Sequence, residues 1–118
     1  WYLKNEWLIT CGAMNENGVT RTPWGNSQIG HRQLWLRDEN YTWSCKYVTS
    51  WGMHAFFHSV LMNYAGTYVT QPRLGINQSH GCVRMAIKWC KGIYDNNDIL
   101  RGSSVTSWDT KIPWSMNR

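Results

Sequence analysis

Aromatic side chains have to supply much of the core of this chain, because aliphatic ones are scarce. Leu, Ile, Val and Phe together make up 22 of its 118 residues, a fraction close to that of disordered sequences. The chain also contains nine Trp, six Tyr and five Met, whereas disordered chains are poor in aromatic residues. Each ring buries a large area, and the length suffices for one domain but not two. We therefore expect a single folded domain with an aromatic core.

The balance of charged residues narrows the range of partners. Twelve Lys and Arg against seven Asp and Glu give a net charge of +5, which favours acidic partners such as nucleic acid, anionic envelope polymers or membrane surfaces. No two basic residues are adjacent, so we do not expect a nucleic-acid site. No apolar run reaches the roughly 18 residues of a membrane span, and no basic segment precedes an apolar one. We expect no membrane span, and we expect any signal or anchor to have been removed or to lie outside this sequence.

Hydrophobic periodicity predicts a mainly β chain with one or two helices. Over residues 33–51 apolar and aromatic side chains alternate with polar ones, the pattern of half-buried strands, with a turn at residues 38–40. The apolar run 56–62 predicts a further strand, and residues 103–108 have β character that closes the sheet. Helical spacing occurs over residues 86–94, where apolar side chains recur every three or four positions.

One short segment, residues 79–84, groups the side chains that nucleophilic chemistry needs. Its thiol, Cys82, comes just before the predicted helix, where the helix dipole and free backbone N–H groups lower a thiol pKa. Gly81 permits a turn that other residues resist, and the N–H groups of Gly81 and Cys82 can then face a developing oxyanion. The loop is therefore a candidate for a cysteine nucleophile together with its oxyanion hole.

A cysteine nucleophile also needs a base within hydrogen-bond reach. His80 is two residues before Cys82, and His58 lies 24 residues before it in a predicted strand. Either imidazole can serve, and the side chain of Ser59 or a backbone carbonyl can orient it in place of a carboxylate. A buried structural thiol is the alternative interpretation of Cys82.

The order of these motifs resembles that of a known enzyme family. The sequence Ser-His-Gly-Cys-Val-Arg at 79–84, with Phe-His-Ser-Val at 57–60, resembles the signature of the L,D-transpeptidase (YkuD) catalytic domain, a cysteine acyltransferase of bacterial peptidoglycan. The resemblance covers roughly residues 8–108. It includes three further segments: Thr10-Cys11-Gly12, the Thr22-Pro23-Trp24-Gly25 turn and Leu74-Gly75.

The resemblance implies a mainly β fold, an L,D-transpeptidase-like β-sandwich with the catalytic Cys at the start of a helix. It implies a peptidoglycan L,D-transpeptidase without cofactor. In such enzymes the thiolate attacks the amide before the D-Ala at position four of a stem tetrapeptide, D-Ala leaves, and an amine of a neighbouring stem resolves the thioester as a 3→3 cross-link. The expected partners are peptidoglycan stem peptides. The family is typically carbapenem-susceptible and extracytoplasmic, in the periplasm or cell wall, and a secreted protein fits the same expectation.

The resemblance also assigns roles to individual residues. It implies Cys82 as nucleophile, His58 as general base, and the N–H groups of Gly81 and Cys82 as oxyanion donors. It implies that His80 and Arg84 shape the loop and the substrate subsite. The catalytic candidates are Cys82, His58, His80 and Gly81, and the substrate-binding candidates are Ser59, Ser79, Arg84 and Trp24.

The same resemblance divides the chain into two parts. It implies that residues 1–108 are an L,D-transpeptidase-like catalytic domain, in which we expect the family's opening strand to be missing, and that residues 109–118 are a C-terminal tail. Within the domain, two short apolar runs around a polar centre predict a hairpin over residues 1–12. The enlarged loop at residues 63–73 is a candidate lid.

The remaining cysteines and histidines leave alternatives open. Cys11 and Cys45 fall in predicted strands and either pair as a disulfide or pack singly, and Cys90 is expected in the core on the apolar helix face. His54 and His58 have the spacing of a helical metal pair, but the residues between them favour a strand. The Glu of a zinc hydrolase motif is also absent, so no metal is expected.

Other functions compatible with the motif also stay open. An L,D-carboxypeptidase uses the same acyl-enzyme but passes it to water, and a cell-wall-targeting toxin can have the same fold. A non-catalytic wall-binding module, which holds anionic polymer with its Trp rings and positive charge, is the principal alternative that is not an enzyme.

Overall fold

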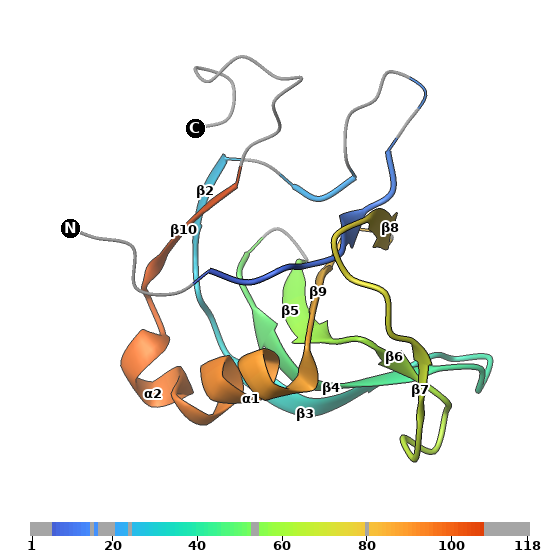
Figure 1. Ribbon diagram of the computed structural model, residues 1–118. Coiled ribbons are helices and arrows are strands. Elements are labelled where there is room, and N and C mark those ends of the chain that lie inside the picture. The colour runs from blue at the N-terminus through green and yellow to red at the C-terminus, as the bar shows by residue number, and fades with distance from the viewer. Residues whose placement is uncertain are drawn as a thin grey trace.

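A six-stranded sheet lies at the centre of the fold, with two small two-stranded sheets and two helices around it (Figure 1). The computed structural model describes residues 6–14, 16, 21–23, 25–52, 55–79 and 81–107. The fold is mainly β with two helices, as predicted. The strands of the central sheet run in the order β7-β6-β4-β5-β9, and β3 also pairs with β4. They are β3 (Arg32–Arg37), β4 (Ser44–Ser50), β5 (Phe56–Ser59), β6 (Leu61–Met62), β7 (Val69–Gln71) and β9 (Val83–Met85).

The smaller elements lie around the edges of the central sheet. One small sheet is parallel and the other is antiparallel. They consist of β1 (Cys11–Gly12) with β8 (Asn77–Ser79), and of β2 (Gly25–Gln28) with β10 (Ser104–Ser107). The helices are α1 (Ile87–Asp95) and α2 (Asn97–Leu100).

The predicted alternation over residues 33–51 is confirmed as the antiparallel pair β3–β4, in which Trp35 pairs with Lys46. The turn between them is closed by a hydrogen bond from the Asp38 N–H to the Trp43 carbonyl (3.0 Å). Within β4, Tyr47 has a φ of 57°, a left-handed conformation that a non-glycine residue rarely adopts. The regular alternation of side chains between the two faces is interrupted there.

The apolar run 56–62 forms two strands instead of the single one expected. β5 and β6 both pair with β4, but the backbone N–H of Val60 between them donates to the carbonyl of Met85 (3.0 Å). The chain then turns back as β7, which pairs with β6 through the register Leu61–Gln71. The candidate lid at residues 63–73 is thus largely an edge hairpin of the sheet.

β9 corrects the expected position of Cys82 relative to the helix. Residues 83–85 pair in parallel with β5, and Arg84 exchanges two backbone hydrogen bonds with Thr10, of 2.9 and 2.7 Å. These contacts hold the segment extended, so α1 begins only at Ile87. The helix itself lies where its periodicity predicted, but Cys82 precedes a strand and is not at a helix start.

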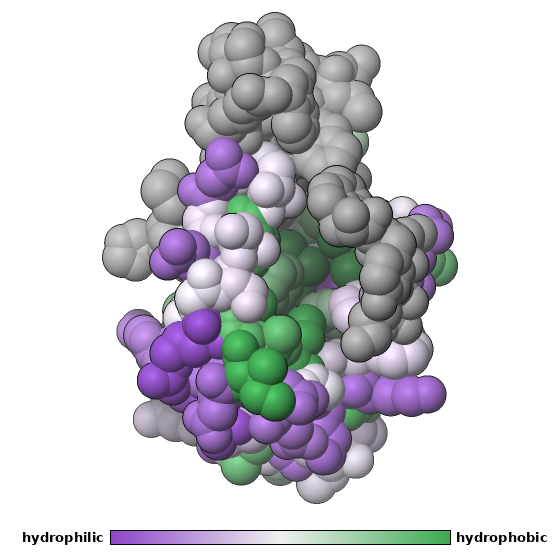
Figure 2. All heavy atoms as spheres, turned by 90° about the vertical axis from the view of Figure 1, so that its left-hand side faces the viewer, coloured by the Kyte–Doolittle hydropathy of each residue, from purple (hydrophilic) through white to green (hydrophobic). Residues whose placement is uncertain are grey.

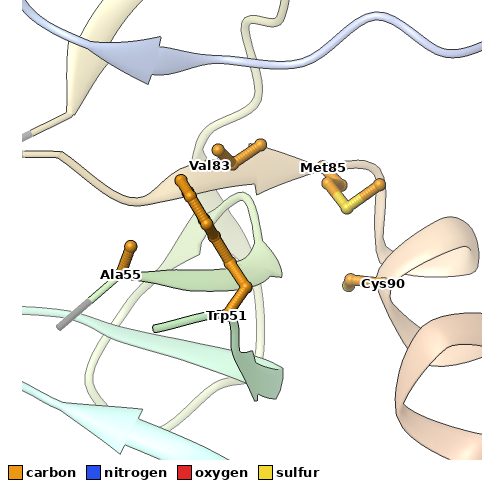
Figure 3. Close-up of a cluster of buried hydrophobic side chains, with 5 residues drawn as sticks. All are labelled: Trp51, Ala55, Val83, Met85 and Cys90. Carbon is orange, nitrogen blue, oxygen red and sulfur yellow. The ribbon is translucent and has the colours of Figure 1, made fainter. Parts of the chain in front are cut away.

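The main core lies between the sheet and α1 (Figure 3). Among the described Trp, Tyr and Phe residues, Trp51 is the one that is buried, at 2% exposed. Large rings seldom lose all contact with solvent. Four partly buried rings pack around the buried centre, those of Trp7, Tyr47, Phe57 and Trp89, and Trp7 stacks on Trp89 with centroids 5.1 Å apart. The buried members of this cluster are Trp51, Ala55, Val83, Met85 and Cys90.

The last strand joins a different sheet from the expected one. β10 pairs with β2, and the Asn97 side chain, fully buried, ties this region to the sheet by donating to the Gly30 carbonyl (2.8 Å). The predicted hairpin over residues 1–12 is only partly within the described residues, and β1 pairs there in parallel with β8. The predicted tail, 109–118, lies outside them. None of the described helices is long and apolar enough to cross a membrane.

Replacing Met85 with Ala tests the core. Met85 is 3% exposed, whereas Met14 is 54% exposed, so the two residues form a matched pair. Met85→Ala is expected to lower the free energy of unfolding by about 2–5 kcal/mol, because it leaves a cavity. Met14→Ala is expected to change it by less than about 0.5 kcal/mol. Urea denaturation of both variants measures the difference, and equal midpoints would contradict this placement of the core.

Candidate active site

Strand alternation places three of the predicted side chains on one face of the sheet. Cys82 and Arg84 are two residues apart on one chain, and Arg84 is in register with His58 on β5. These side chains line a cavity of about 330 Å³. Its lining residues are Leu36, Trp43, His58, Leu61, Gln71, Ser79, Cys82 and Arg84.

The imidazole of His58 is fixed in one tautomer. His58 is 4% exposed, and its Nδ1 lies 2.7 Å from the backbone carbonyl oxygen of Ser59. Because a carbonyl oxygen can only accept, Nδ1 carries the proton and Nε2 keeps its lone pair. Burial lowers the pKa of His58 to about 4, so the ring is neutral at neutral pH. A neutral imidazole with a free Nε2 is the form that a general base requires.

The thiol of Cys82 is half-buried and protonated at rest. Burial raises its pKa, while a hydrogen bond with the backbone of Phe56 and the positive charge of Arg84 act in the opposite direction. The helix dipole has no part in this, because β9 separates Cys82 from α1. A nucleophilic thiolate at this position would therefore require proton transfer to a base.

Ser79 holds the loop that carries the thiol. Its hydroxyl donates to the carbonyl of Cys82 (2.5 Å) and accepts from the N–H of Gly81 (3.2 Å). Gly81 has a φ of 139°, and a side chain there would be strained. Since the Gly81 N–H is bound to Ser79, it is not available to an oxyanion in this conformation, which corrects that expectation. The Cys82 N–H remains a predicted oxyanion donor.

Arg84 is a buried cation without a carboxylate partner. It is 6% exposed, and one of its terminal nitrogens donates to Gln71 Oε1 (2.8 Å). Its Nε is buried without a hydrogen-bond partner, and no Asp or Glu among the described residues is within salt-bridge distance. Burying a charge without a partner of opposite sign costs free energy. An anion bound beside Arg84 would therefore stabilise it.

The structure does not bring Ser59 into the cavity as a substrate ligand. Its side chain is fully buried, accepts from the N–H of Lys46 (2.9 Å) and donates to the carbonyl of Val60 (2.9 Å). Its carbonyl, not its hydroxyl, orients His58. His80 and Trp24 lie outside the described residues.

Two contributors were not foreseen from the sequence. Gln71 belongs to an exposed edge strand, and its contact with Arg84 arises only when β7 folds back on β6. The backbone of Phe56 reaches the thiol because β5 and β9 run side by side in parallel. The one available signal for both was the apolar run 56–62, which identified β5 but not its partner.

The structure also bears on the other cysteines and on the histidine pair considered as metal ligands. All four cysteines are free thiols, so Cys11 and Cys45 pack singly, and Cys90 is fully buried in the core as expected. Within the described part of the chain no group of three metal-ligating side chains occurs. His58 lies in a strand, which removes the helical spacing on which the zinc interpretation depended, and His54 is outside the described residues.

A larger and more apolar cavity, of about 370 Å³, lies away from Cys82. Val83 and Phe57 line it, so it is on the opposite face of β5 and β9 from His58 and Arg84. Figure 2 faces the side of α1 and α2 and shows a hollow lined with hydrophobic residues above hydrophilic ones. The larger cavity contains no described histidine or basic side chain, so size alone does not identify the reactive site.

Comparisons with known proteins bear on the family and the fold of this chain. No family model matches the chain. A Bacillus subtilis (strain 168) protein named "Putative L,D-transpeptidase YciB" is 34% identical over 94 residues, which are 75% of this chain and 48% of that protein. The crystal structure of L,D-transpeptidase (Yku) from Stackebrandtia nassauensis matches with a TM-score of 0.54 and 22% identity. That match covers 86% of this chain and 42% of the other and shows a shared fold.

The fold and the sequence together define the class of this protein. The chain spans about half the length of the curated relative and 42% of the solved structure. The relative is 34% identical to this chain over 94 residues, and the solved structure shares its fold. The chain therefore carries an L,D-transpeptidase domain.

The buried neutral His58 predicts a pH-dependent stability. The ordinary pKa of a histidine is 6.5, whereas that of His58 in the folded state is about 4. Between these two pH values the unfolded state binds a proton at this residue and the folded state does not. The unfolding free energy is therefore expected to fall between these two pH values, by on the order of 3 kcal/mol.

Chemical denaturation across this pH range measures the effect. His58→Gln is expected to remove this step, because no group with a lowered pKa remains at that position. The exposed residue His31 provides the matched control, and His31→Gln is expected to keep the step. An unchanged pH slope in His58→Gln would rule out a buried neutral imidazole.

Proposed function

We propose that this domain is the catalytic part of a peptidoglycan L,D-transpeptidase that forms 3→3 cross-links. The observation that carries the proposal is the shared cavity of Cys82, His58 and Arg84, with Nε2 of His58 unprotonated. A thiol, a neutral base and an unpaired cation are the groups that acyl transfer from an acidic peptide needs. The relative and the fold support the same enzyme class.

The first half-reaction forms an acyl-enzyme. Nε2 of His58 takes the thiol proton while Sγ of Cys82 attacks the carbonyl carbon of the third stem residue. The tetrahedral oxyanion is stabilised by backbone N–H donation, for which the Cys82 N–H is the candidate, and by the positive charge of Arg84. When the intermediate collapses, the C–N bond breaks, His58 returns the proton to the departing amine, and D-Ala leaves.

The second half-reaction regenerates the thiol. The side-chain amine of a neighbouring stem attacks the thioester carbonyl and passes a proton to His58, and the C–S bond breaks. The new amide is the cross-link, and the proton on His58 returns to Sγ. Water in place of the amine gives an L,D-carboxypeptidase, and both reactions use the same residues up to the thioester.

Arg84 supports recognition of an acidic donor. D-Ala at position four carries a free carboxylate, and the guanidinium of Arg84 lines the cavity without a carboxylate of its own. Gln71 holds one side of the guanidinium and so orients the rest of it. A carboxylate bound there would complete the charge-assisted hydrogen bonds of Arg84 and place the scissile amide near Cys82.

Substrates of this kind place the proposed activity outside the cytoplasm, in the periplasm or the cell wall. A toxin that acts on the same bonds and a wall-binding module without turnover are the competing functions. The intact combination of Cys82 and an unprotonated His58 Nε2 favours an enzyme over a binding module.

The acylation experiment tests the enzyme class. Intact mass spectrometry after incubation with a carbapenem is expected to show a covalent adduct on the wild-type protein and none on Cys82→Ala. With a stem tetrapeptide, a dimeric product formed only when an acceptor amine is supplied supports transfer, whereas tripeptide alone supports the carboxypeptidase. A folded wild-type protein that forms neither adduct nor product would contradict the proposed function.

A preference for substrates with a free terminal carboxylate tests the proposed role of Arg84. The wild-type protein is expected to prefer a tetrapeptide with a free terminal carboxylate over its amide by about tenfold or more, the effect of hydrogen bonds to a charged group. Arg84→Gln is expected to abolish this preference, and Gln71→Leu, which leaves the cation in place, is expected to weaken it. Equal processing of acid and amide by the wild-type protein would contradict this role.

A further inference from the structure

The chain around Thr10 lies between β9 and the segment that follows β7, and it is hydrogen-bonded to both. On one side Thr10 exchanges two backbone hydrogen bonds with Arg84 of β9. On the other side the N–H of Gly75 donates to the carbonyl of Ile9 (2.8 Å). In Figure 1 this is the blue segment that passes β9 on its way to β8. Thr10 therefore lies where the two strands that carry Arg84 and its partner Gln71 are joined.

The side chain of Thr10 adds a second connection to the segment after β7. Its hydroxyl donates to the backbone carbonyl of Arg73 (2.9 Å). Thr10 is fully buried, and a buried hydroxyl costs free energy unless it is hydrogen-bonded. The pairing with Arg84 uses only backbone atoms, so it does not require a hydroxyl at this position. The side chain of Thr10 thus serves the contact with Arg73 and not the strand pairing.

The link from Arg73 to the cavity is short and stiff. Arg73 is two residues after Gln71, whose Oε1 accepts from the guanidinium of Arg84. The residue between them is Pro72, whose ring fixes its own φ and restricts the conformation of the residue before it. The backbone here has little freedom to absorb a movement of the Arg73 carbonyl. The position of that carbonyl therefore helps to determine the position of Gln71.

These contacts form a closed circuit around the guanidinium. The backbone of Thr10 holds Arg84, the side chain of Arg84 binds Gln71, and Gln71 leads through Pro72 to Arg73, whose carbonyl returns to the hydroxyl of Thr10. A guanidinium binds a carboxylate best through two parallel hydrogen bonds, which require its plane to have a fixed orientation. Gln71 occupies one terminal nitrogen, while Nε is buried without a partner. Whatever fixes Gln71 also fixes the direction of the remaining donors.

We propose that Thr10 is a positioning residue for carboxylate recognition. Its hydroxyl fixes Gln71 through Arg73, and Gln71 orients the guanidinium of Arg84 toward the terminal carboxylate of the donor peptide. The inference rests on the proposed function, which assigns that carboxylate to Arg84. Thr10 does not line the cavity and does not touch the substrate. Removal of one hydroxyl behind the site is therefore expected to change which ligands bind there.

The test measures the binding of a stem tetrapeptide and of its C-terminal amide by calorimetry, in the Cys82→Ala background so that no turnover occurs. Thr10→Val keeps the shape and the backbone hydrogen bonds of this residue but removes the hydroxyl. It is expected to lower the ratio of acid to amide affinity about threefold or more, the contribution of one hydrogen bond, with the amide affinity within about twofold of the parent. Thr10→Ser, which keeps the hydroxyl, is expected to retain the ratio.

Thr49→Val provides the matched control. Thr49 is also fully buried, but its hydroxyl has no hydrogen-bond partner in the part of the chain that the structure describes. The same substitution at this position is expected to leave the ratio of acid to amide affinity unchanged. A purely structural role of Thr10 predicts a different result, in which Thr10→Val weakens the binding of acid and amide alike.

A second variant keeps the inference testable if circular dichroism shows that Thr10→Val is not folded. Pro72 is exposed, so Pro72→Gly leaves the core intact. It frees the backbone between Arg73 and Gln71 and is expected to lower the ratio of acid to amide affinity about twofold or more. An unchanged ratio in Pro72→Gly would show that the Arg73 carbonyl does not control Gln71, and the inference would fail.

The remaining outcomes separate this inference from the proposed function. The inference is overturned if Thr10→Val keeps the ratio, if Thr10→Ser behaves like Thr10→Val, or if the parent does not distinguish acid from amide. If Thr10→Val lowers the ratio but wild-type Cys82 is not acylated by a carbapenem, Thr10 positions Arg84 and the proposed function fails. If wild-type Cys82 is acylated and Thr10→Val keeps the ratio, the proposed function stands and the inference fails.

Discussion

The parallel pairing of β5 with β9 is the interaction on which the site depends. Its register places His58 opposite Arg84 and Phe57 opposite Val83, so one face of the pair carries reactive side chains and the other joins the core. A slip of one residue would exchange the two sets and bury the charges against Trp51 and Met85. The apolar set is anchored by α1, and therefore the same packing that stabilises the fold also fixes the reactive residues.

The electrostatics of the cavity favour a resting state with little charge except on Arg84. His58 is neutral because burial lowers its pKa to about 4, and Cys82 is protonated because burial raises its pKa. The positive charge of Arg84 contributes in the same direction to His58 and in the opposite direction to the thiol. Two unit charges at about 4 Å interact by roughly 4 kcal/mol near a protein surface. An entering carboxylate would thus stabilise the unpaired guanidinium. In the resting state no thiolate does this, because Cys82 is protonated.

Local patterns in the sequence predicted much of the fold, and contacts between distant segments account for the errors. The alternation over residues 33–51 and the helical spacing over 86–94 were sufficient because each depends on neighbours a few residues apart. The strand β9 was missed because three residues give no measurable periodicity, and its extended form depends on β5 and Thr10. That omission led to the wrong location of Cys82 at a helix start.

The candidate site was likewise predicted in part from local sequence and missed where distant segments meet. The motif at residues 79–84 and the strand with His58 were recognisable as chemistry, and the strand register then brought them into one cavity. Of the two groups that the sequence offered to orient the imidazole, a backbone carbonyl does so, that of Ser59. The predicted substrate contact of Ser59 was wrong, because its side chain is fully buried. Gln71 could not be predicted, because its side chain is an ordinary exposed amide until the edge hairpin returns it to Arg84.

The strand β4 connects the cavity to the opposite face of the sheet. The N–H of Lys46 donates to the hydroxyl of Ser59, whose carbonyl in turn accepts from Nδ1 of His58. The next residue, Tyr47, has the left-handed backbone, a conformation that costs of order 1–3 kcal/mol. That hydrogen bond fixes the backbone just before the strained residue, and the contacts with Tyr94 and Lys46 hold its ring. One backbone segment therefore supports the tautomer of His58 on one face and the contact of Tyr47 with Tyr94 of α1 on the other.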